Sequence, residues 1–185
     1  YSTGRFTVAK KDKTSDRLLE GAVFELHWAN DPESGIDAEA GAGMWADYLE
    51  RVLSENPATP AEMRGVKPES VKATSEAPYT AGTRLQFETN GETMVSLDGL
   101  PFGTYQLKEV KAPEGYESPF ADLDQSQRSF TIGAEEGSRE ITLETIYNER
   151  HPYQLILQKQ TDYGTPVSGI IFTAVSYTHL RAHET

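Results

Sequence analysis

Residues 97–116, LDGLPFGTYQLKEVKAPEGY, limit what this chain can fold into more than any other stretch. Glycine and proline are closely spaced over 98–103, and they favour a tight turn because they supply the backbone angles of a chain reversal. The alternation of side chains that follows predicts a strand over 104–110. The stretch therefore predicts a reversal that leads directly into a strand.

Glu109 is the unusual residue of this predicted strand. Side chains alternate along a strand, so Glu109 shares a face with Tyr105 and Leu107, which are expected to face the core. An ionised carboxylate is costly in such a place unless it is paired or protonated. The alternative is that Glu109 lies at the strand end and reaches water.

The composition is that of an acidic, globular protein without cysteine. The 185 residues are enough for one good core and the beginning of a second, with 37% hydrophobic and 25% charged residues. A formal net charge of -12 argues against nucleic acid and anionic membrane surfaces as partners, because both need clustered Lys and Arg. No apolar run approaches the roughly 18 residues of a membrane span. The lack of cysteine excludes disulfides, thiolate nucleophiles and Cys-based metal sites.

The pattern of residues 97–116, Leu-x-Gly-Leu-Pro-x-Gly-x-Tyr-x-Leu-x-Glu-x-Lys-Ala-Pro-x-Gly-Tyr, resembles the signature of the Cna-B domains. These are the prealbumin-like or SpaA-type modules of Gram-positive surface adhesins and pilins. The resemblance implies an all-β fold, an immunoglobulin-like (prealbumin-like) β-sandwich over residues 1–150. In that family the Glu of the motif assists a spontaneous isopeptide bond between a Lys on the first strand and an Asn on the last. Glu109 is therefore the expected catalytic residue.

Lys10 matches the lysine of this family pattern. Over residues 5–12, parity points Phe6, Val8 and Lys10 inward and Lys11 outward. On the pattern alone, a lone inward lysine could equally snorkel towards water. The resemblance implies instead that Lys10 is one end of the crosslink.

Asn148 matches the acceptor asparagine, on a last strand predicted over 139–149. Strand parity puts Ile146 and Asn148 on the face opposite Leu143. A bulge near residues 144–145 is therefore needed to turn all of them inward. Without that bulge, Asn148 would point outward and the bond would not form.

These three residue types make chemical sense together. A lysine buried in an apolar core loses its solvation, its pKa falls, and its neutral amine becomes a nucleophile. A buried glutamate keeps its proton, hydrogen-bonds the carboxamide oxygen and transfers protons to the departing ammonia. The event happens once per molecule, so the protein is not expected to be an enzyme. No Ser/His/Asp set or phosphate loop occurs in the matched region.

Residues 29–82 depart from the compact family pattern and are interpreted as an insertion. One amphipathic helix is predicted there, because apolar residues recur at helical spacing: Met44, Trp45, Tyr48, Leu49, Val52 and Leu53. Its stripe either covers the domain's own sandwich or binds a partner. Residues 57–82 show no period and predict a surface loop, and the acidic run 31–37 lacks the pattern of a calcium loop.

Two further patterns concern strands. Residues 84–89 and 92–97 flank Asn90-Gly91, which predicts a hairpin with a type I′ turn. Residues 151–174 repeat the beginning of the chain, with Lys159 as a possible crosslinking lysine, and predict the first two strands of a truncated second module. Residues 175–185 do not continue the repeat and are interpreted as a non-native tail, so the spacing of His179 and His183 is not taken as a metal site.

The predicted function is that of a structural stalk or shaft module in a cell-wall-anchored adhesin or pilin. The alternative is a binding module whose helical insertion engages a host protein or glycan. The expected partners are neighbouring modules or pilin subunits, at the surface of a Gram-positive bacterium. No cofactor and no metal are expected.

Overall fold

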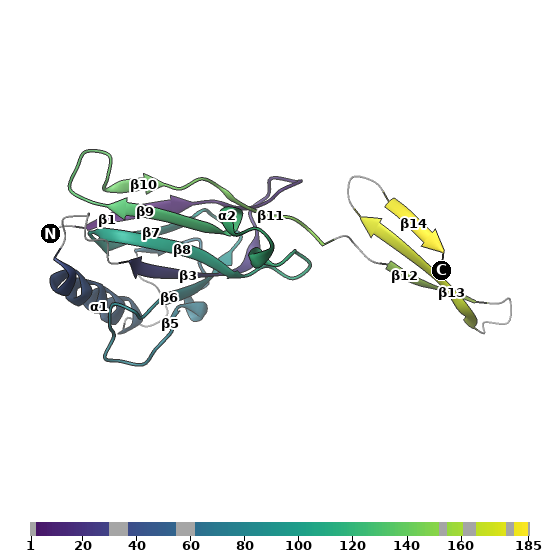
Figure 1. The fold of residues 1–185 in the computed structure, drawn as a ribbon, viewed down its shortest axis with the longest axis horizontal. Coiled ribbons are helices and arrows are strands. Elements are labelled where there is room, and N and C mark those ends of the chain that lie inside the picture. The colour runs from purple at the N-terminus through teal and green to yellow at the C-terminus, as the bar shows by residue number, and fades with distance from the viewer. Residues whose placement is uncertain are drawn as a thin grey trace. The chain divides into compact units, whose positions relative to one another are not determined.

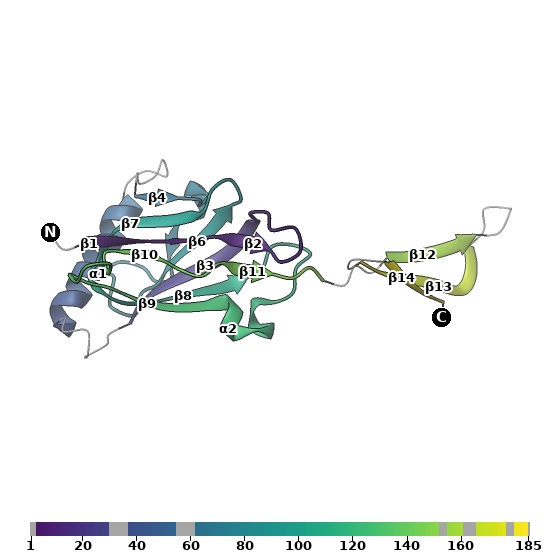
Figure 2. The same cartoon turned by 90° about the horizontal axis from the view of Figure 1, so that it is seen from above.

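A computed structural model describes residues 3–29, 37–54 and 62–151, together with the backbone of three later strands over 155–160, 166–176 and 180–184. The chain divides into two compact units, Tyr1–Glu149 and Arg150–Thr185. The first unit holds two facing sheets with a helix at one end, and the second is a small sheet (Figures 1 and 2).

The sandwich of the first unit is built from three groups of strands. The five-stranded sheet has the order β5 (Lys72–Ala73), β6 (Leu85–Asn90), β3 (Glu20–Ala29), β8 (Gly103–Lys111) and β9 (Gln127–Ile132). The four-stranded sheet has the order β10 (Glu140–Thr142), β1 (Thr3–Val8), β7 (Val95–Pro101) and β4 (Met63–Arg64). A parallel pair, β2 (Lys10–Asp12) and β11 (Ile146–Asn148), continues the first and last strands.

The core lies between the sheets and follows the alternation that the sequence predicts. Tyr105 and Leu107 of β8 are fully buried, as is Phe6 of β1. The ring of Phe130 from β9 joins the two sheets, 4.9 Å from the ring of Phe6 and 5.6 Å from that of Tyr105. The all-β sandwich expected from the sequence is therefore confirmed.

The helix of the insertion, α1 (Ala38–Ser54), packs on its own sandwich. Trp45 is buried, stacks on Tyr48 with ring centroids 5.5 Å apart, and meets Tyr105 edge-on at 5.7 Å. The indole Nε1 of Trp45 also donates to the carbonyl of Thr83 at 2.9 Å. The helix begins before the predicted apolar stripe. Asp37 Oδ1 caps its first turn by accepting a hydrogen bond from the backbone N–H of Ala40. Met44 and Leu53, at the sides of the stripe, are only half-buried.

The predicted hairpin around Asn90-Gly91 is wrong. β6 pairs with β3 and β5, whereas β7 pairs with β1 and β4, so the chain crosses from one sheet to the other between them. Only Gly91 has a positive φ, of 73°, whereas a type I′ turn requires two. The Asn90 side chain instead accepts from the backbone N–H of Glu92 at 2.8 Å. The crossing places apolar residues of both strands in the same core, which outweighs the local turn signal.

Two other expectations differ from the structure. The reversal predicted over 98–103 is confined to Phe102, because residues up to Pro101 pair with β1 as part of β7. The predicted loop 57–82 contains β4, β5 and the 3₁₀ turn Pro68–Ser70 within its described part. Two-residue strands are too short to produce a period in the sequence, so pattern analysis misses them.

The second unit is a three-stranded antiparallel sheet of β12 (Leu155–Gln160), β13 (Pro166–Ser176) and β14 (Leu180–Glu184). The sequence predicts only two strands, ending at residue 174. The additional strand pairs with β13, whose edge would otherwise leave backbone groups unpaired. Lys159 lies in β12, but its side chain is outside the described residues, as is His179. The truncated module and the non-native tail stay predictions.

Candidate crosslinking site

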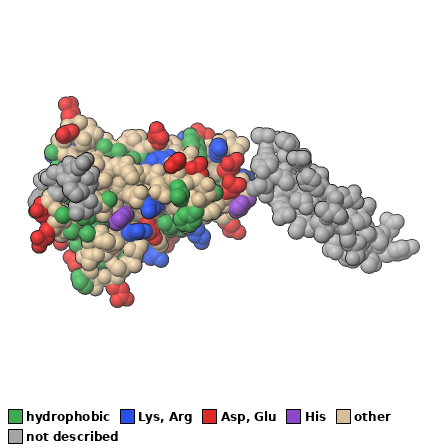
Figure 3. Space-filling model, in the orientation of Figure 1, with side chains coloured by type: hydrophobic (Ala, Val, Ile, Leu, Met, Phe, Trp, Pro, Cys, Tyr) green, Lys and Arg blue, Asp and Glu red, His purple; other side chains and the backbone are tan. Residues whose placement is uncertain are grey.

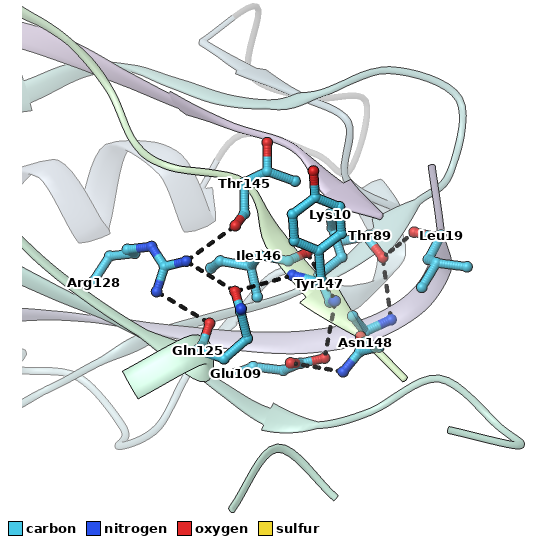
Figure 4. A network of polar contacts seen from close by, with 11 residues as sticks. Lys10, Leu19, Thr89, Glu109, Gln125, Arg128, Thr145, Ile146, Tyr147 and Asn148 are labelled. Atoms are coloured by element: carbon cyan, nitrogen blue, oxygen red, sulfur yellow. Dashed lines mark hydrogen bonds and ion pairs between the residues drawn. The ribbon is translucent and has the colours of Figure 1, made fainter. Parts of the chain in front are cut away.

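The structure brings Lys10, Glu109 and Asn148 together in the core of the first unit (Figure 4). Their exposed fractions are 2%, 2% and 5%. Lys10 Nζ lies 3.8 Å from Glu109 Oε2, and Asn148 Nδ2 donates to Glu109 Oε1 at 3.1 Å. Lys10 Nζ also donates to the carbonyl of Ile146 at 3.1 Å. All three predicted residues therefore meet at one place.

The pairing of the first and last strands explains why Lys10 and Asn148 share a face. β2 and β11 run parallel, with Lys10 opposite Ile146 and Asp12 opposite Asn148. Lys10 and Asp12 point inward on β2, and Ile146 and Asn148 point inward on β11. Glu109 reaches the same space from the end of β8, two positions beyond the buried Leu107.

A bulge in the last strand makes this arrangement possible. The predicted strand 139–149 is interrupted between β10 and β11, and the first strand is interrupted at Ala9. Thr7 pairs with Thr142 and Lys10 pairs with Ile146, so the last strand contains one more residue than the first over this interval. That extra residue reverses the parity of everything after it. The bulge near 144–145, which an inward-facing Asn148 requires, is therefore present.

Burial shifts the pKa values of Lys10 and Glu109 in opposite directions. Burial lowers the pKa of Lys10 to about 8, against the opposing effect of Glu109 and Asp12. Burial raises the pKa of Glu109 to about 7, against the opposing effects of Lys10 and the hydrogen bond from Asn148. The alternative that Glu109 reaches water is wrong, because the strand end is covered. Each residue is thus moved towards its neutral form.

The carboxamide of Asn148 faces Glu109 with its nitrogen. The chemistry expected from the sequence has the carboxamide oxygen accept a hydrogen bond from protonated Glu109, whereas here Nδ2 donates to the carboxylate. A half-turn of the carboxamide exchanges the oxygen and the nitrogen and meets that requirement. Within the described residues, Asn148 Oδ1 has no hydrogen-bond partner, so the half-turn breaks no other contact of that oxygen.

A small cavity of about 80 Å³ lies beside Glu109 and Asn148. Glu109, Asn148 and the buried Ser126 line it, and each of the three has a buried oxygen without a hydrogen-bond partner among the described residues. The cavity therefore gives polar space next to the carboxamide.

One family model matches the chain: the SpaA prealbumin-like fold domain, over residues 4–146. The chain belongs to this family. The match includes Lys10 and Glu109 and ends just before Asn148. It is a family of structural modules, not of enzymes. Among curated proteins, none matches the chain.

Solved pilin structures are similar to this SpaA-type domain at low identity. The full-length major pilin SpaD from Corynebacterium diphtheriae is 16% identical with a TM-score of 0.48, over 94% of this chain and 36% of its own. The minor pilin GBS52 of Streptococcus agalactiae is 21% identical with a TM-score of 0.42, over 86% and 49%. The major pilin GBS80 of the same species, as a 35 kDa C-terminal fragment, is 23% identical with a TM-score of 0.44, over 79% and 44%. The chain spans less than half of each of these pilins.

Two residues of the SpaA-type domain support the site in ways that the sequence analysis missed. Tyr116, the last residue of the motif, donates its hydroxyl to Asp12 Oδ2 at 2.5 Å, so it ties the motif to β2. Asp12 Oδ1 accepts from the backbone of Thr14 and Ser15, which closes the loop after β2. Arg128 contacts the bulge. The tyrosine that ends the motif was a visible signal, whereas nothing near Arg128 in the sequence indicates its role.

In the part of the chain that the structure describes, no group of three or more His, Cys, Asp or Glu side chains could hold a metal ion. Among those same residues, no helix combines the length and apolar character needed to cross a membrane.

Proposed function

We propose that this domain is a structural stalk or shaft module of a bacterial surface adhesin or pilin, stabilised by an isopeptide bond between Lys10 and Asn148. The observation that carries the proposal is the meeting of Lys10, Glu109 and Asn148 in a buried site. Membership of the SpaA family supports the structural role. The location is the cell surface of a Gram-positive bacterium, and the partners are neighbouring modules or pilin subunits.

The bond forms by attack of the neutral Lys10 Nζ on Cγ of Asn148. Protonated Glu109 hydrogen-bonds the carboxamide oxygen and stabilises the charge that develops there. The Nζ–Cγ bond forms, the Cγ–Nδ2 bond breaks, and Glu109 carries a proton from Nζ to the leaving nitrogen. Ammonia is released into the adjacent cavity. Folding holds the reacting groups together, which supplies a large effective molarity.

The described surface favours a stalk over the alternative of a partner-binding insertion. The stripe of α1 is buried against its own sandwich, with Trp45 and Leu49 fully covered. Figure 3 shows acidic and basic side chains scattered among one another on the visible face. Large exposed hydrophobic side chains of the described residues are Met94, Phe120 and Leu123. A helix that served a partner would instead offer its apolar stripe to solvent.

The intact mass of the purified protein under denaturing conditions tests the proposal. The wild type is expected to be lighter than its sequence by one ammonia, and Glu109→Ala is expected to have its full sequence mass. The matched control is Glu114→Ala, an exposed glutamate of the same motif that is expected to lose ammonia as the wild type does. A wild-type protein with its full mass would exclude the bond.

A further inference from the structure

The bulge between β10 and β11 is held from outside the strand pair by one side chain. Arg128, near the start of β9, donates from Nε to the carbonyl of Glu144 at 3.2 Å. Its Nη2 donates to the carbonyl of Thr145 at 3.0 Å (Figure 4). These are the bulge residues themselves. On either side of them, the N–H groups of Leu143 and Ile146 bond the first strand at Thr7 and Ala9.

Arg128 is itself fixed by α2 (Leu123–Ser126). Its Nη1 donates to the carbonyls of Asp124, Gln125 and Gln127, at 2.9, 3.1 and 2.8 Å. Its Nη2 donates to Gln125 Oε1 at 3.1 Å, so all three guanidinium nitrogens are engaged.

Gln125 extends the same network to the strand that carries the acceptor. The Oε1 atom that accepts from Arg128 also accepts from the backbone N–H of Tyr147 at 3.3 Å. Tyr147 is the residue directly before Asn148. Arg128 and Gln125 together therefore hold the backbone from Glu144 to Tyr147.

We infer that Arg128, supported by Gln125, is a positioning residue that turns Asn148 towards Lys10 by holding the bulge in the last strand. A shift of one residue in a strand moves every later side chain to the opposite face. The extra residue between Thr142 and Ile146 is what makes Asn148 point inward. This inference rests on the proposed Lys10–Asn148 bond and explains how its acceptor is oriented.

The positive charge of Arg128 could act in a second way, because it also lowers the pKa of Lys10. The two roles respond differently to substitution. Lysine keeps the charge but has one point-like donor group, whereas arginine offers five N–H groups in a rigid fork. Arg128→Lys therefore removes the clamp and keeps the charge, and Arg128→Met removes both.

The test measures the rate of bond formation in the full chain. Unfolded protein is diluted from denaturant, acid-quenched at intervals and weighed for loss of one ammonia, while circular dichroism reports the folded fraction. Both Arg128→Lys and Arg128→Met are expected to slow the reaction of folded molecules about a hundredfold, the cost of a roughly 1 Å misplacement of reacting groups. The control is Arg5→Met, which removes an arginine that binds Glu140 of the last strand outside the bulge.

Deletion of Thr145 tests whether Arg128 acts through the bulge. If Arg128 only stabilised the fold, the deletion variant would still need it. The shortened strand has as many residues between Thr142 and Ile146 as the first strand has between Thr7 and Lys10, so Asn148 faces inward without a bulge. Crosslinking in the deletion variant is expected to be insensitive to Arg128→Met.

The outcomes separate the inference from the proposed function. A wild type that never loses ammonia removes both. The inference alone is overturned if Arg128→Met reacts at the wild-type rate, or if only Arg128→Lys does, which assigns the effect to charge. It is also overturned if the deletion variant fails to react or still requires Arg128. The inference is supported if Arg128→Lys and Arg128→Met both react slowly and the Thr145 deletion variant reacts without needing Arg128.

Discussion

Lys10 and Glu109 show how burial moves two ordinary side chains towards their neutral forms. Neither residue is exposed by more than 2%, and the pKa values move in opposite directions, to about 8 for Lys10 and about 7 for Glu109. Between these values the pair holds one proton in total. The form with a neutral amine and a protonated carboxyl is one of the two ways to place that proton.

The rate of bond formation is therefore expected to depend on pH as a bell with its maximum between pH 7 and 8. Below pH 7 the rate falls about tenfold per pH unit because the pair takes up a second proton and the amine of Lys10 is no longer free to attack. Above pH 8 it falls similarly because the pair loses its one proton and Glu109 has none to donate. The measurement is the pH-jump rate of ammonia loss, by mass, in folded protein. Folding rates measured at the same pH values serve as the control. A rate that rises steadily up to pH 10 would show that Glu109 does not act as an acid.

The residues that meet at the candidate site were predictable, and those that support it through distant contacts were not. Lys10, Glu109 and the need for a bulge before Asn148 follow from strand parity together with a motif. Tyr116 and Arg128 act through contacts with Asp12 and the bulge, and these partners lie far away in the sequence. Such contacts arise from the packing of distant elements, and no periodic pattern in the nearby sequence predicts them.

At the scale of elements, α1 is part of the core despite lying in the insertion. Trp45 is wedged between Tyr48 and Tyr105, and its Nε1 is hydrogen-bonded to Thr83. The helix thus connects the insertion to β8, the strand that carries Glu109. The sequence predicted the apolar stripe because the helical period is long enough to detect, and it left open what the stripe covers.

Trp45→Ala is expected to lower the free energy of unfolding by about 3 to 5 kcal/mol, because it empties a fully buried site. Denaturant unfolding in the Glu109→Ala background measures this without the proposed crosslink. Met44→Ala, a neighbouring and only half-buried helix position, is the control and is expected to cost much less. Equal stability of the Trp45 and Met44 variants would mean that the helix does not belong to the core.

The error in the hairpin prediction also belongs to this scale. Asn90-Gly91 is a strong local signal, but a turn can connect strands of one sheet or of two. Which of these occurs depends on the partners available to each strand. Here β3 pairs with β6 and β1 pairs with β7, pairings that only the complete sandwich provides.

At the scale of the whole domain, the first and last strands run parallel and side by side through β1 with β10 and β2 with β11. A bond from Lys10 to Asn148 would close nearly the whole domain into one loop. On the chain-entropy model, such a loop is worth about 4 to 5 kcal/mol. In a chain without cysteine, the bond would replace a disulfide.

The parallel arrangement also decides the path of a pulling force. Tension that enters at β1 and leaves after β11 would pass from Lys10 directly to Asn148 through the covalent bond, without loading the intervening strands. The absence of native cysteine allows handles to be attached at Thr3→Cys and His151→Cys. Single-molecule pulling of the wild type is expected to show no release of the residues between Lys10 and Asn148.

Glu109→Ala with the same handles is expected to release those residues, with a contour gain of roughly 450 Å at about 3.3 Å per residue. The Glu114→Ala variant, which keeps the site intact, is expected to behave as the wild type. A wild type that extends as far as Glu109→Ala would show that the bond does not carry the load. A stalk module needs a domain that transmits tension without lengthening, so this measurement tests whether the proposed bond at Lys10 supports the proposed mechanical role of the whole domain.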